Sequence, residues 1–166
     1  MAPERIVYVS TTGVYGDAAG ATLTEDTPPA PATDRARRRR DAETTLRAWC
    51  EPREVEWVIL RVPGIYGPGR LPLDRLRRGE PALAESEAGP GNRIHVDDLA
   101  DACVTALLNH KARNRIYNVG DGDHMSSTAP PERLNCGPDR GAGRHAVIDD
   151  DRRTAGRRQR RRERLA

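Results

Sequence analysis

The sequence contains no phenylalanine, and Lys111 is the single lysine among 28 basic residues. Its three cysteines, Cys50, Cys103 and Cys136, stand far apart and form no CxxC pair. This spacing implies neither a zinc site nor a disulfide framework, and it fits a reducing cytoplasm. No apolar run approaches the ~20 residues that span a bilayer, and residues 1–10 lack the pattern of a signal peptide. We therefore predict a cytoplasmic protein without membrane contact.

Charge and composition divide the 166 residues into two parts. Residues 1–128 contain 17 basic and 19 acidic residues, whereas residues 129–166 contain 11 and 6. The second part is also interrupted by Pro and Gly, so we predict one folded domain over 1–128 and a disordered Arg-rich tail over 129–166. The run Arg152–Arg164 has the charge to meet nucleic-acid phosphates but no aromatic residue to stack on bases. A solvated tail, or one produced by a change of reading frame, is therefore favoured over a nucleic-acid partner.

Three motifs follow one another in the first part: Arg5–Gly16 (RIVYVSTTGVYG), Arg61–Arg70 (RVPGIYGPGR) and Asn92–Ala102 (NRIHVDDLADA). The first two are apolar, β-branched runs that enter glycine-containing turns, which is typical of buried parallel strands. The third has the pattern of a strand end followed by a helix start. Ligands bind parallel α/β sheets at the carboxyl ends of their strands, so the motifs predict a binding site at that edge.

The elements around the motifs alternate between strand and helix, which predicts an α/β fold with a parallel sheet. The expected strands cover residues 6–9, 54–61 and 115–119, and the expected helices cover 33–50 and 97–110, with a short helix or turn over 73–78. Thr33 or Asp34 is the expected cap of the first long helix.

Helical spacing also predicts which faces turn inward. The expected stripe of the first long helix is Trp49, Leu46, Ala42, Arg39 and Arg35. The expected stripe of the last helix is Leu99, Cys103, Ala106, Leu107 and His110.

With these motifs in this order, and with the acidic-Pro loop Thr24–Pro29, the chain resembles an extended or atypical short-chain dehydrogenase/reductase of the NAD-dependent epimerase/dehydratase type. The resemblance covers roughly residues 4–128. It implies a Rossmann-type doubly wound parallel sheet and a cofactor that is NAD or NADP. The implied reaction is hydride transfer or redox-neutral epimerisation on a small molecule such as a sugar nucleotide.

The resemblance also implies site residues. Thr11 stands where the family has the catalytic Ser or Thr that polarises the substrate. A second segment is expected to lie against the nicotinamide ring of the cofactor, and it consists of Val62, Pro63, Gly64 and Ile65. Arg70 and Arg93 are expected near the substrate. Tyr15 and its neighbours are expected to shape the turn beside the nicotinamide.

One departure from the family affects the chemistry. The family's tyrosine and lysine, four residues apart on the catalytic helix, align with Arg35 and Arg39. Arginine cannot replace tyrosine as a proton donor because its pKa is too high to titrate. Arg39 could still donate hydrogen bonds to ribose hydroxyls. We therefore expect an atypical member with impaired catalysis; the alternative is a non-catalytic NAD(P)-binding or protein-interaction module.

A second departure concerns the cofactor phosphates. No GxxGxxG turn occurs in the sequence, so we expect the N-terminal nucleotide-binding half of the fold to be missing from these residues.

Three further features have a structural alternative to a site role. Arg35–Arg40 is either an anion site or a solvated helix face. Asp97 and Asp98 fit the favoured acidic start of a helix better than a catalytic pair. The histidines lack the spacing of metal ligands, and a catalytic role for His95 is the weaker alternative.

Overall fold

The computed structural model describes residues 2–68, 78, 90–121 and 125–126. Its centre is a parallel sheet in the order β1–β2–β6, formed by Arg5–Thr11, Glu56–Val62 and Arg115–Asn118. Two long helices, α1 (Asp34–Cys50) and α3 (Val96–Leu108), connect the strands in the order β1, α1, β2, α3, β6. The predicted parallel α/β architecture is therefore confirmed, and the strand boundaries differ from the expected ones by at most two residues.

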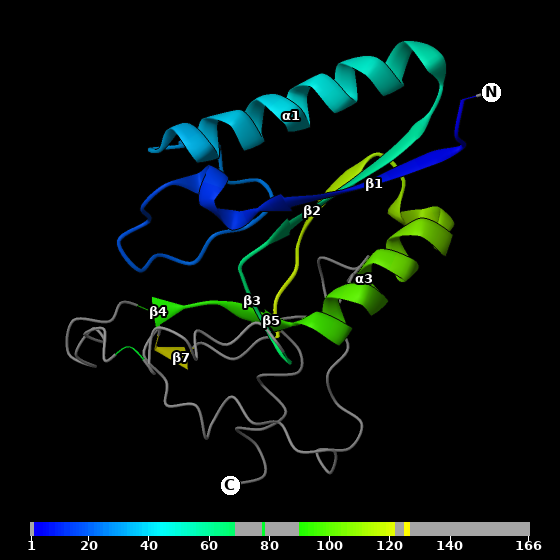
Figure 1. The fold of residues 1–166 in the computed structure, drawn as a ribbon. Helices are drawn as coiled ribbons and strands as arrows, with labels where there is room; N and C mark the ends of the chain where they lie inside the picture. Colours follow the sequence, from blue (N-terminus) through cyan, green and yellow to red (C-terminus); the bar gives the residue numbers. More distant parts are fainter. Residues whose placement is uncertain (1, 69–77, 79–89, 122–124, 127–166) are drawn as a thin grey trace, which may run out of the picture.

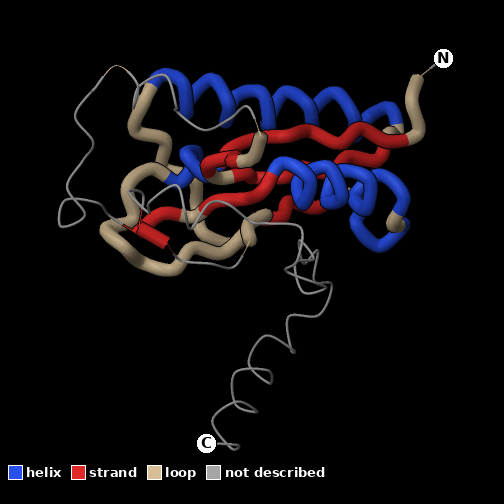
Figure 2. The backbone as a smooth tube through the Cα atoms, turned by 60° about the horizontal axis from the view of Figure 1, so that its bottom comes forward, coloured by secondary structure: helices blue, strands red, loops and turns tan. Residues whose placement is uncertain are grey.

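The two helices lie on opposite faces of this sheet, so the described part of the chain has three layers (Figures 1 and 2). Short 3-10 turns follow three of the elements: η1 (Thr12–Tyr15), η2 (Glu51–Arg53) and η4 (His110–Ala112). Two small sheets lie beyond the carboxyl ends of the main strands. One pairs β3 (Gly64–Tyr66) with β5 (Arg93–His95) in parallel, and the other pairs β4 (Pro90–Gly91) with β7 (Met125–Ser126) antiparallel.

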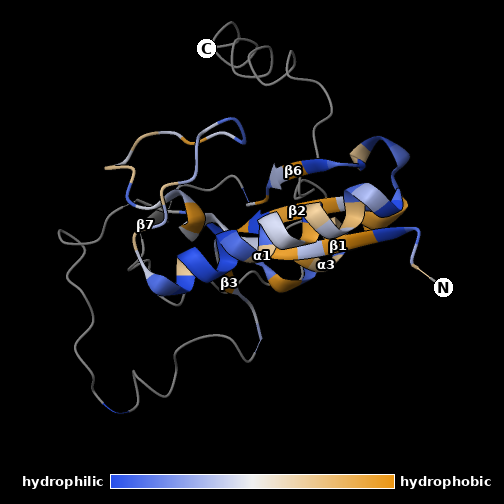
Figure 3. Cartoon of the chain, turned by 90° about the horizontal axis from the view of Figure 1, so that it is seen from above, coloured by the Kyte–Doolittle hydropathy of each residue, from blue (hydrophilic) through white to orange (hydrophobic). Residues whose placement is uncertain are grey.

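The core forms because alternate side chains of β2 point to opposite helices. Val58, Leu60 and Val62 pack in one cluster with the inward face of α3, whereas Trp57 and Ile59 pack with the end of α1. Both faces of β2 are covered, which explains its nearly continuous run of apolar residues. The hydrophobic colouring accordingly gathers in the strands between the helices, while the arginine-rich start of α1 is hydrophilic (Figure 3).

Helix α1 begins as predicted but is rotated by one residue from the expected stripe. The hydroxyl of Thr33 caps it by accepting a hydrogen bond from the Ala36 amide at 3.2 Å. The buried residues are Ala36, Glu43 and Cys50. The expected stripe was anchored on Trp49, which is 39% exposed and covered by the Arg53 guanidinium at 4.7 Å from its ring centroid. A cation on the aromatic face lets this side chain stay at the surface, so the apolar residue was a wrong guide to the helix phase.

The predicted inward face of α3 is correct for Leu99 and Ala106, which are buried, and wrong for Leu107, which is half exposed. The helix ends at Leu108, so His110 lies in the following turn and not on this face.

His95 caps the start of α3, because its Nδ1 accepts a hydrogen bond from the Asp97 amide at 3.3 Å. Asp97 and Asp98 occupy the first turn, where their negative charges interact favourably with the positive end of the helix dipole. This geometry supports the structural alternative for all three residues.

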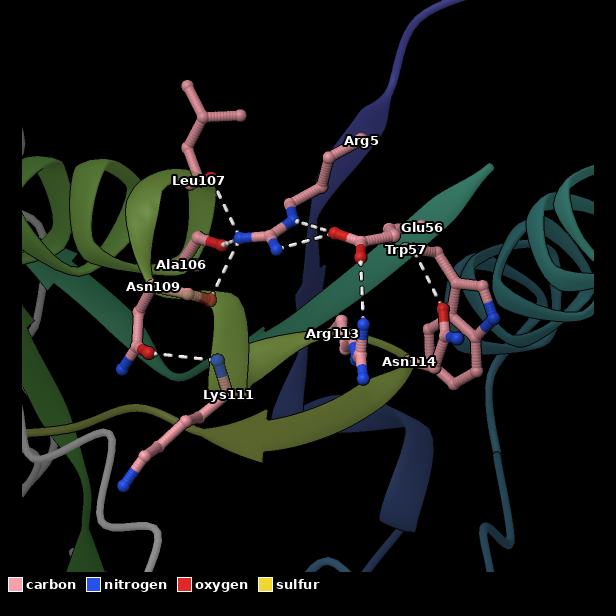
Figure 4. A network of polar contacts seen from close by, with 9 residues as sticks. All are labelled: Arg5, Glu56, Trp57, Ala106, Leu107, Asn109, Lys111, Arg113 and Asn114. Carbon is pink, nitrogen blue, oxygen red and sulfur yellow. Dashed lines mark hydrogen bonds and ion pairs between the residues drawn. The ribbon is translucent and has the colours of Figure 1, made fainter. Parts of the chain in front are cut away.

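The amino end of the sheet is held by Arg5 (Figure 4). Its Nε donates to Glu56 Oε2 on the neighbouring strand at 2.8 Å. Its NH1 group donates to the carbonyl oxygens of Ala106, Leu107 and Asn109 at 2.9, 2.7 and 2.9 Å. One arginine thus joins two strands to the C-terminus of α3, where unpaired helix carbonyls need donors.

Several expectations fall on residues outside the described part: the short helix or turn at 73–78 apart from Arg78, the tail over 129–166, and Arg70. Among the helices that the structure describes, none is long and apolar enough to cross a membrane.

Candidate active site

The carboxyl ends of the three strands bring together residues that are far apart in the sequence. Thr11 ends β1 and is the register partner of Val62 at the end of β2, while Asn118 at the end of β6 pairs with Arg61. Thr11 is half-buried, and its Oγ1 accepts a hydrogen bond from the Gly13 amide at 3.1 Å. This bond caps η1 and fixes the direction of the hydroxyl at the edge where ligands bind α/β sheets.

The segment expected to meet the nicotinamide leaves β2 at the same edge. Val62 is buried, Pro63 and Ile65 are half-buried, and Gly64 is exposed. Gly64 is the register partner of Arg93, whose Cγ would lie 3.8 Å from a Cβ at that glycine. The structure therefore places Arg93 beside this segment, with main chain accessible between them.

Arg35 and Arg39, which are expected at the family's tyrosine and lysine positions, lie on the exposed first half of α1. The expectation that they face the core is wrong, because the inward phase of the helix runs through their neighbours. Arg39 donates a hydrogen bond to the Tyr8 hydroxyl at 3.0 Å and lies 6.0 Å from the ring centroid. Arg35 makes no hydrogen bond or ion pair with any described residue. Neither arginine is bonded to Thr11.

A buried ion pair lies beneath this edge of the sheet. Glu43 on α1 and Arg61 on β2 are 0% and 1% exposed. Arg61 donates from Nε to Oε1 at 3.1 Å and from NH2 to Oε2 at 2.7 Å. The Ser10 hydroxyl donates to Oε1 at 2.6 Å, and Arg40 donates to Oε2 at 3.2 Å. Four hydrogen bonds thus satisfy the carboxylate, which is what a buried charge requires.

Burial alone raises the pKa of Glu43, but the hydrogen bonds from Arg61 and Ser10 and the charge of Arg61 outweigh it, and the pKa lies below its ordinary value. Burial lowers the pKa of Arg61, and its bonds with Glu43 more than compensate, so the net shift is upward. Both directions favour the charged forms, and the pair remains ionised at neutral pH.

The ion pair continues into a polar chain that reaches β6. The Arg61 guanidinium lies 4.8 Å from the ring centroid of Tyr15, a residue of η1 that is 4% exposed. The Tyr15 hydroxyl donates to Asn118 Oδ1 at 2.8 Å. The main-chain N–H of Asn118 donates in turn to Oε1 of Glu25, a residue of the loop before α1, at 2.7 Å. The ends of β1, β2 and β6 are therefore joined by side chains.

Gly16 allows the main chain to turn sharply after Tyr15 and to pass close to the loop before α1. Its φ is +76°, and a Cβ there would lie 2.3 Å from the carbonyl oxygen of Ala30. Only glycine fits this close approach, which keeps the Glu25 loop against the turn that contains Tyr15.

The sequence interpretation missed the roles of Ser10, Glu43, Arg61 and Asn118. One signal was available: Arg61 is a charged residue at the end of a strand pattern that is otherwise buried, so it needed a buried partner. Which acid would supply that partner depended on the phase of α1.

No cluster of His, Cys, Asp and Glu that could hold a metal ion occurs among the described residues. The described edge offers an oriented hydroxyl at Thr11 and exposed main chain at Gly64, which suits one flat, polar end of a cofactor. The sequence supplies no GxxGxxG turn for a pyrophosphate. The described residues thus fit the nicotinamide side of a dinucleotide.

Comparison with known proteins identifies relatives of the chain. The chain is 38% identical over 115 residues to protein YeeZ of Escherichia coli K12, an alignment that covers 69% of this chain and 39% of that protein. It is 28% identical over 131 residues to human dTDP-D-glucose 4,6-dehydratase, covering 74% and 37%. The chain therefore spans about two fifths of the length of the curated relatives it matches.

Solved structures show the same fold. MoeE5 in complex with UDP-glucose and NAD matches with a TM-score of 0.64 and 28% identity, over 74% of this chain and 44% of that one. A dTDP-glucose 4,6-dehydratase from Bacillus anthracis in complex with NAD matches with a TM-score of 0.67 and 21% identity, over 87% and 52%. The predicted Rossmann-type fold is thereby confirmed. A model of the NAD dependent epimerase/dehydratase family matches residues 1–120, and the chain belongs to this family.

Proposed function

We propose that this chain forms the nicotinamide-facing and substrate-facing part of an NAD(P)-dependent, epimerase/dehydratase-like oxidoreductase whose substrate is a sugar nucleotide or a similar small molecule. The observation that supports this most is the register of β1 and β2, which sets the Thr11 hydroxyl beside the Val62–Gly64 segment. Membership of the family and the NAD and UDP-glucose bound to MoeE5 support the same class of ligands.

NAD or NADP, when bound, would accept or supply the hydride. The residues that would hold its nicotinamide end are those that frame the edge, namely Val62, Pro63, Gly64 and Ile65. Arg39 would donate to ribose hydroxyls once it leaves Tyr8. Thr11 would polarise the oxygen of the substrate at the reacting carbon, since its hydroxyl direction is already set by the Gly13 amide.

Catalysis by this chain is proposed to be weak or absent. Proton transfer at the substrate oxygen needs a group that titrates near neutral pH. The position that the family fills with tyrosine holds Arg35, whose guanidinium stays protonated. Arg35 also has no bonded neighbour among the described residues that would orient it.

The alternative function is a non-catalytic NAD(P)-binding or protein-interaction module. The exposed arginines of α1 favour this alternative, because they remove the acid while leaving Thr11 and Gly64 accessible. Cytoplasmic localisation remains a prediction, supported by the free thiols of Cys50 and Cys103.

Calorimetric titration with NAD and NADP, combined with a turnover assay on UDP-glucose and dTDP-glucose, tests these proposals. We expect saturable cofactor binding, and binding of UDP-glucose that weakens in Thr11→Val and is unchanged in Thr45→Val, an exposed threonine on α1. We expect no turnover above the buffer rate. Rapid turnover would contradict impaired catalysis. Absence of cofactor binding would leave only the protein-interaction module.

A further inference from the structure

We propose that Asn118 is a ligand-binding residue of this site: Tyr15 orients its carboxamide so that the NH2 group is presented to an oxygen atom on the sugar of the bound nucleotide. The inference rests on the proposed function, because it assumes that the site takes a sugar nucleotide. It assigns a specificity contact to a strand end that neither the motifs nor the family match identifies.

The position of Asn118 suits a ligand contact. It is the last residue of β6, half-buried, at the same sheet edge as Thr11. Thr11 and Asn118 lie on the two strands that flank β2, so their Cα atoms are about 10 Å apart at two strand spacings. By strand alternation, Asn118 shares the α1 face of the sheet with Arg61, whereas Thr11 shares the α3 face with Val62. The two residues would therefore contact different parts of a ligand bound along the edge.

The orientation of the carboxamide follows from its hydrogen bond. A carboxamide has an acceptor oxygen at one end and two N–H donors at the other. Because the Tyr15 hydroxyl donates to Oδ1 at 2.8 Å, the NH2 group points away from the phenol. Nδ2 makes no hydrogen bond to any described residue. A half-buried donor with a fixed direction is available for an acceptor on a ligand.

Tyr15 is itself fixed, so it acts as a positioning residue. Its ring lies against the Arg61 guanidinium at 4.8 Å, and Arg61 is held by two hydrogen bonds to the fully buried Glu43. The phenol can rotate away only by losing the cation–π contact. The ion pair beneath the sheet thereby sets the direction of a polar group at its edge.

The main chain of Asn118 is held as well. Its amide donates to Glu25 Oε1 at 2.7 Å, and the following amide, of Val119, donates to the Arg61 carbonyl at 3.0 Å. A donor fixed through both backbone and side chain loses little conformational freedom when a ligand binds. This preorganisation is expected of a specificity contact.

The experiment follows the side-chain NH2 signal of Asn118 in ¹⁵N-labelled full-length chain by NMR, with UDP-glucose and UDP as the probes. Asn118→Asp assigns the signal. It keeps an oxygen acceptor for Tyr15 and removes the donor. The Asn109 NH2 group, at the opposite end of the sheet, is the internal control.

We expect UDP-glucose to shift the Asn118 NH2 signal saturably, UDP to leave it in place, and neither to shift Asn109. Asn118→Asp should weaken the binding of UDP-glucose about tenfold. It should not weaken the binding of UDP to a comparable extent, although UDP is the more highly charged ligand. Tyr15→Phe should weaken UDP-glucose by a smaller factor, because the carboxamide loses its orientation.

Saturable UDP-glucose binding that leaves the Asn118 signal unmoved would overturn this inference alone. If the wild-type chain binds neither probe, the proposed sugar-nucleotide function fails and the inference fails with it. Should Asn118→Asp not fold, the wild-type signal and Tyr15→Phe still decide the question.

Discussion

Replacing Glu43 by leucine should be among the most damaging single substitutions in the described domain. Glu43→Leu removes all four hydrogen bonds to the carboxylate and leaves the guanidinium of Arg61, which is 1% exposed, without a counterion. Breaking a buried pair by deleting one partner costs about 3–5 kcal/mol. Domains of this size have free energies of unfolding of about 5–15 kcal/mol, so the variant should lose a large fraction of its stability.

The double variant Glu43→Leu/Arg61→Met separates the two causes of this loss. Removing both charges eliminates the unpaired guanidinium, and apolar side chains of similar volume often replace a buried pair at little cost. The double variant should therefore be about 2 kcal/mol more stable than Glu43→Leu. Asp34→Ala is the matched control, because it removes an exposed ion pair with Arg37 at i,i+3 and should change stability by less than about 0.5 kcal/mol.

Urea denaturation followed by circular dichroism measures the free energy of unfolding of these variants. A loss below about 1 kcal/mol in Glu43→Leu, or a double variant no more stable than the single one, would refute the interpretation. The first result would mean that water reaches Arg61. The second would mean that the cost arises from packing and not from the unpaired charge.

Three further outcomes are expected. The pKa of Glu43 in the folded state lies below its ordinary value of 4.5, so as the pH falls the unfolded state takes up the proton first. The contribution of Glu43 to the free energy of unfolding is therefore constant above about pH 4.5 and decreases below it. Glu43→Gln should flatten this decrease in urea titrations at several pH values. Arg5→Met should cost about 2 kcal/mol through lost donors to the α3 carbonyls, and a melting temperature equal to that of the exposed Arg37→Met control would disprove this. Gly16→Ala should cost more than about 1 kcal/mol in thermal unfolding, whereas Gly13→Ala, whose new Cβ would make ordinary contacts, should cost less.

The sequence was a good guide wherever local chemistry decides structure. The apolar run before Ser10 predicted a parallel strand, and Thr33 predicted the first turn of α1, because buried strands and helix caps depend on residues close in sequence. The edge position of Thr11 and Gly64 was also predictable from the family motifs. The structure confirms that these segments meet at neighbouring strand ends.

The sequence was a poor guide to the phase of α1 and to the polar chain. Helical periodicity favoured Trp49 as a core residue, yet a tertiary contact with Arg53 covers its ring at the surface. The true inward face contains Glu43, a residue that periodicity analysis treats as exposed. Its burial depends on Arg61, 18 residues away and on another element. Such pairs depend on three-dimensional packing, which composition and spacing do not encode.

We propose that this chain contacts a dinucleotide mainly at its nicotinamide end. The most direct test compares the dissociation constants of NAD and nicotinamide mononucleotide for the full-length chain, by NMR titration of the Thr11 and Gly64 amides. We predict similar values, within about threefold, because the sequence contains no GxxGxxG turn for the second phosphate. A hundredfold tighter binding of NAD, or no shift of either amide, would contradict the claim.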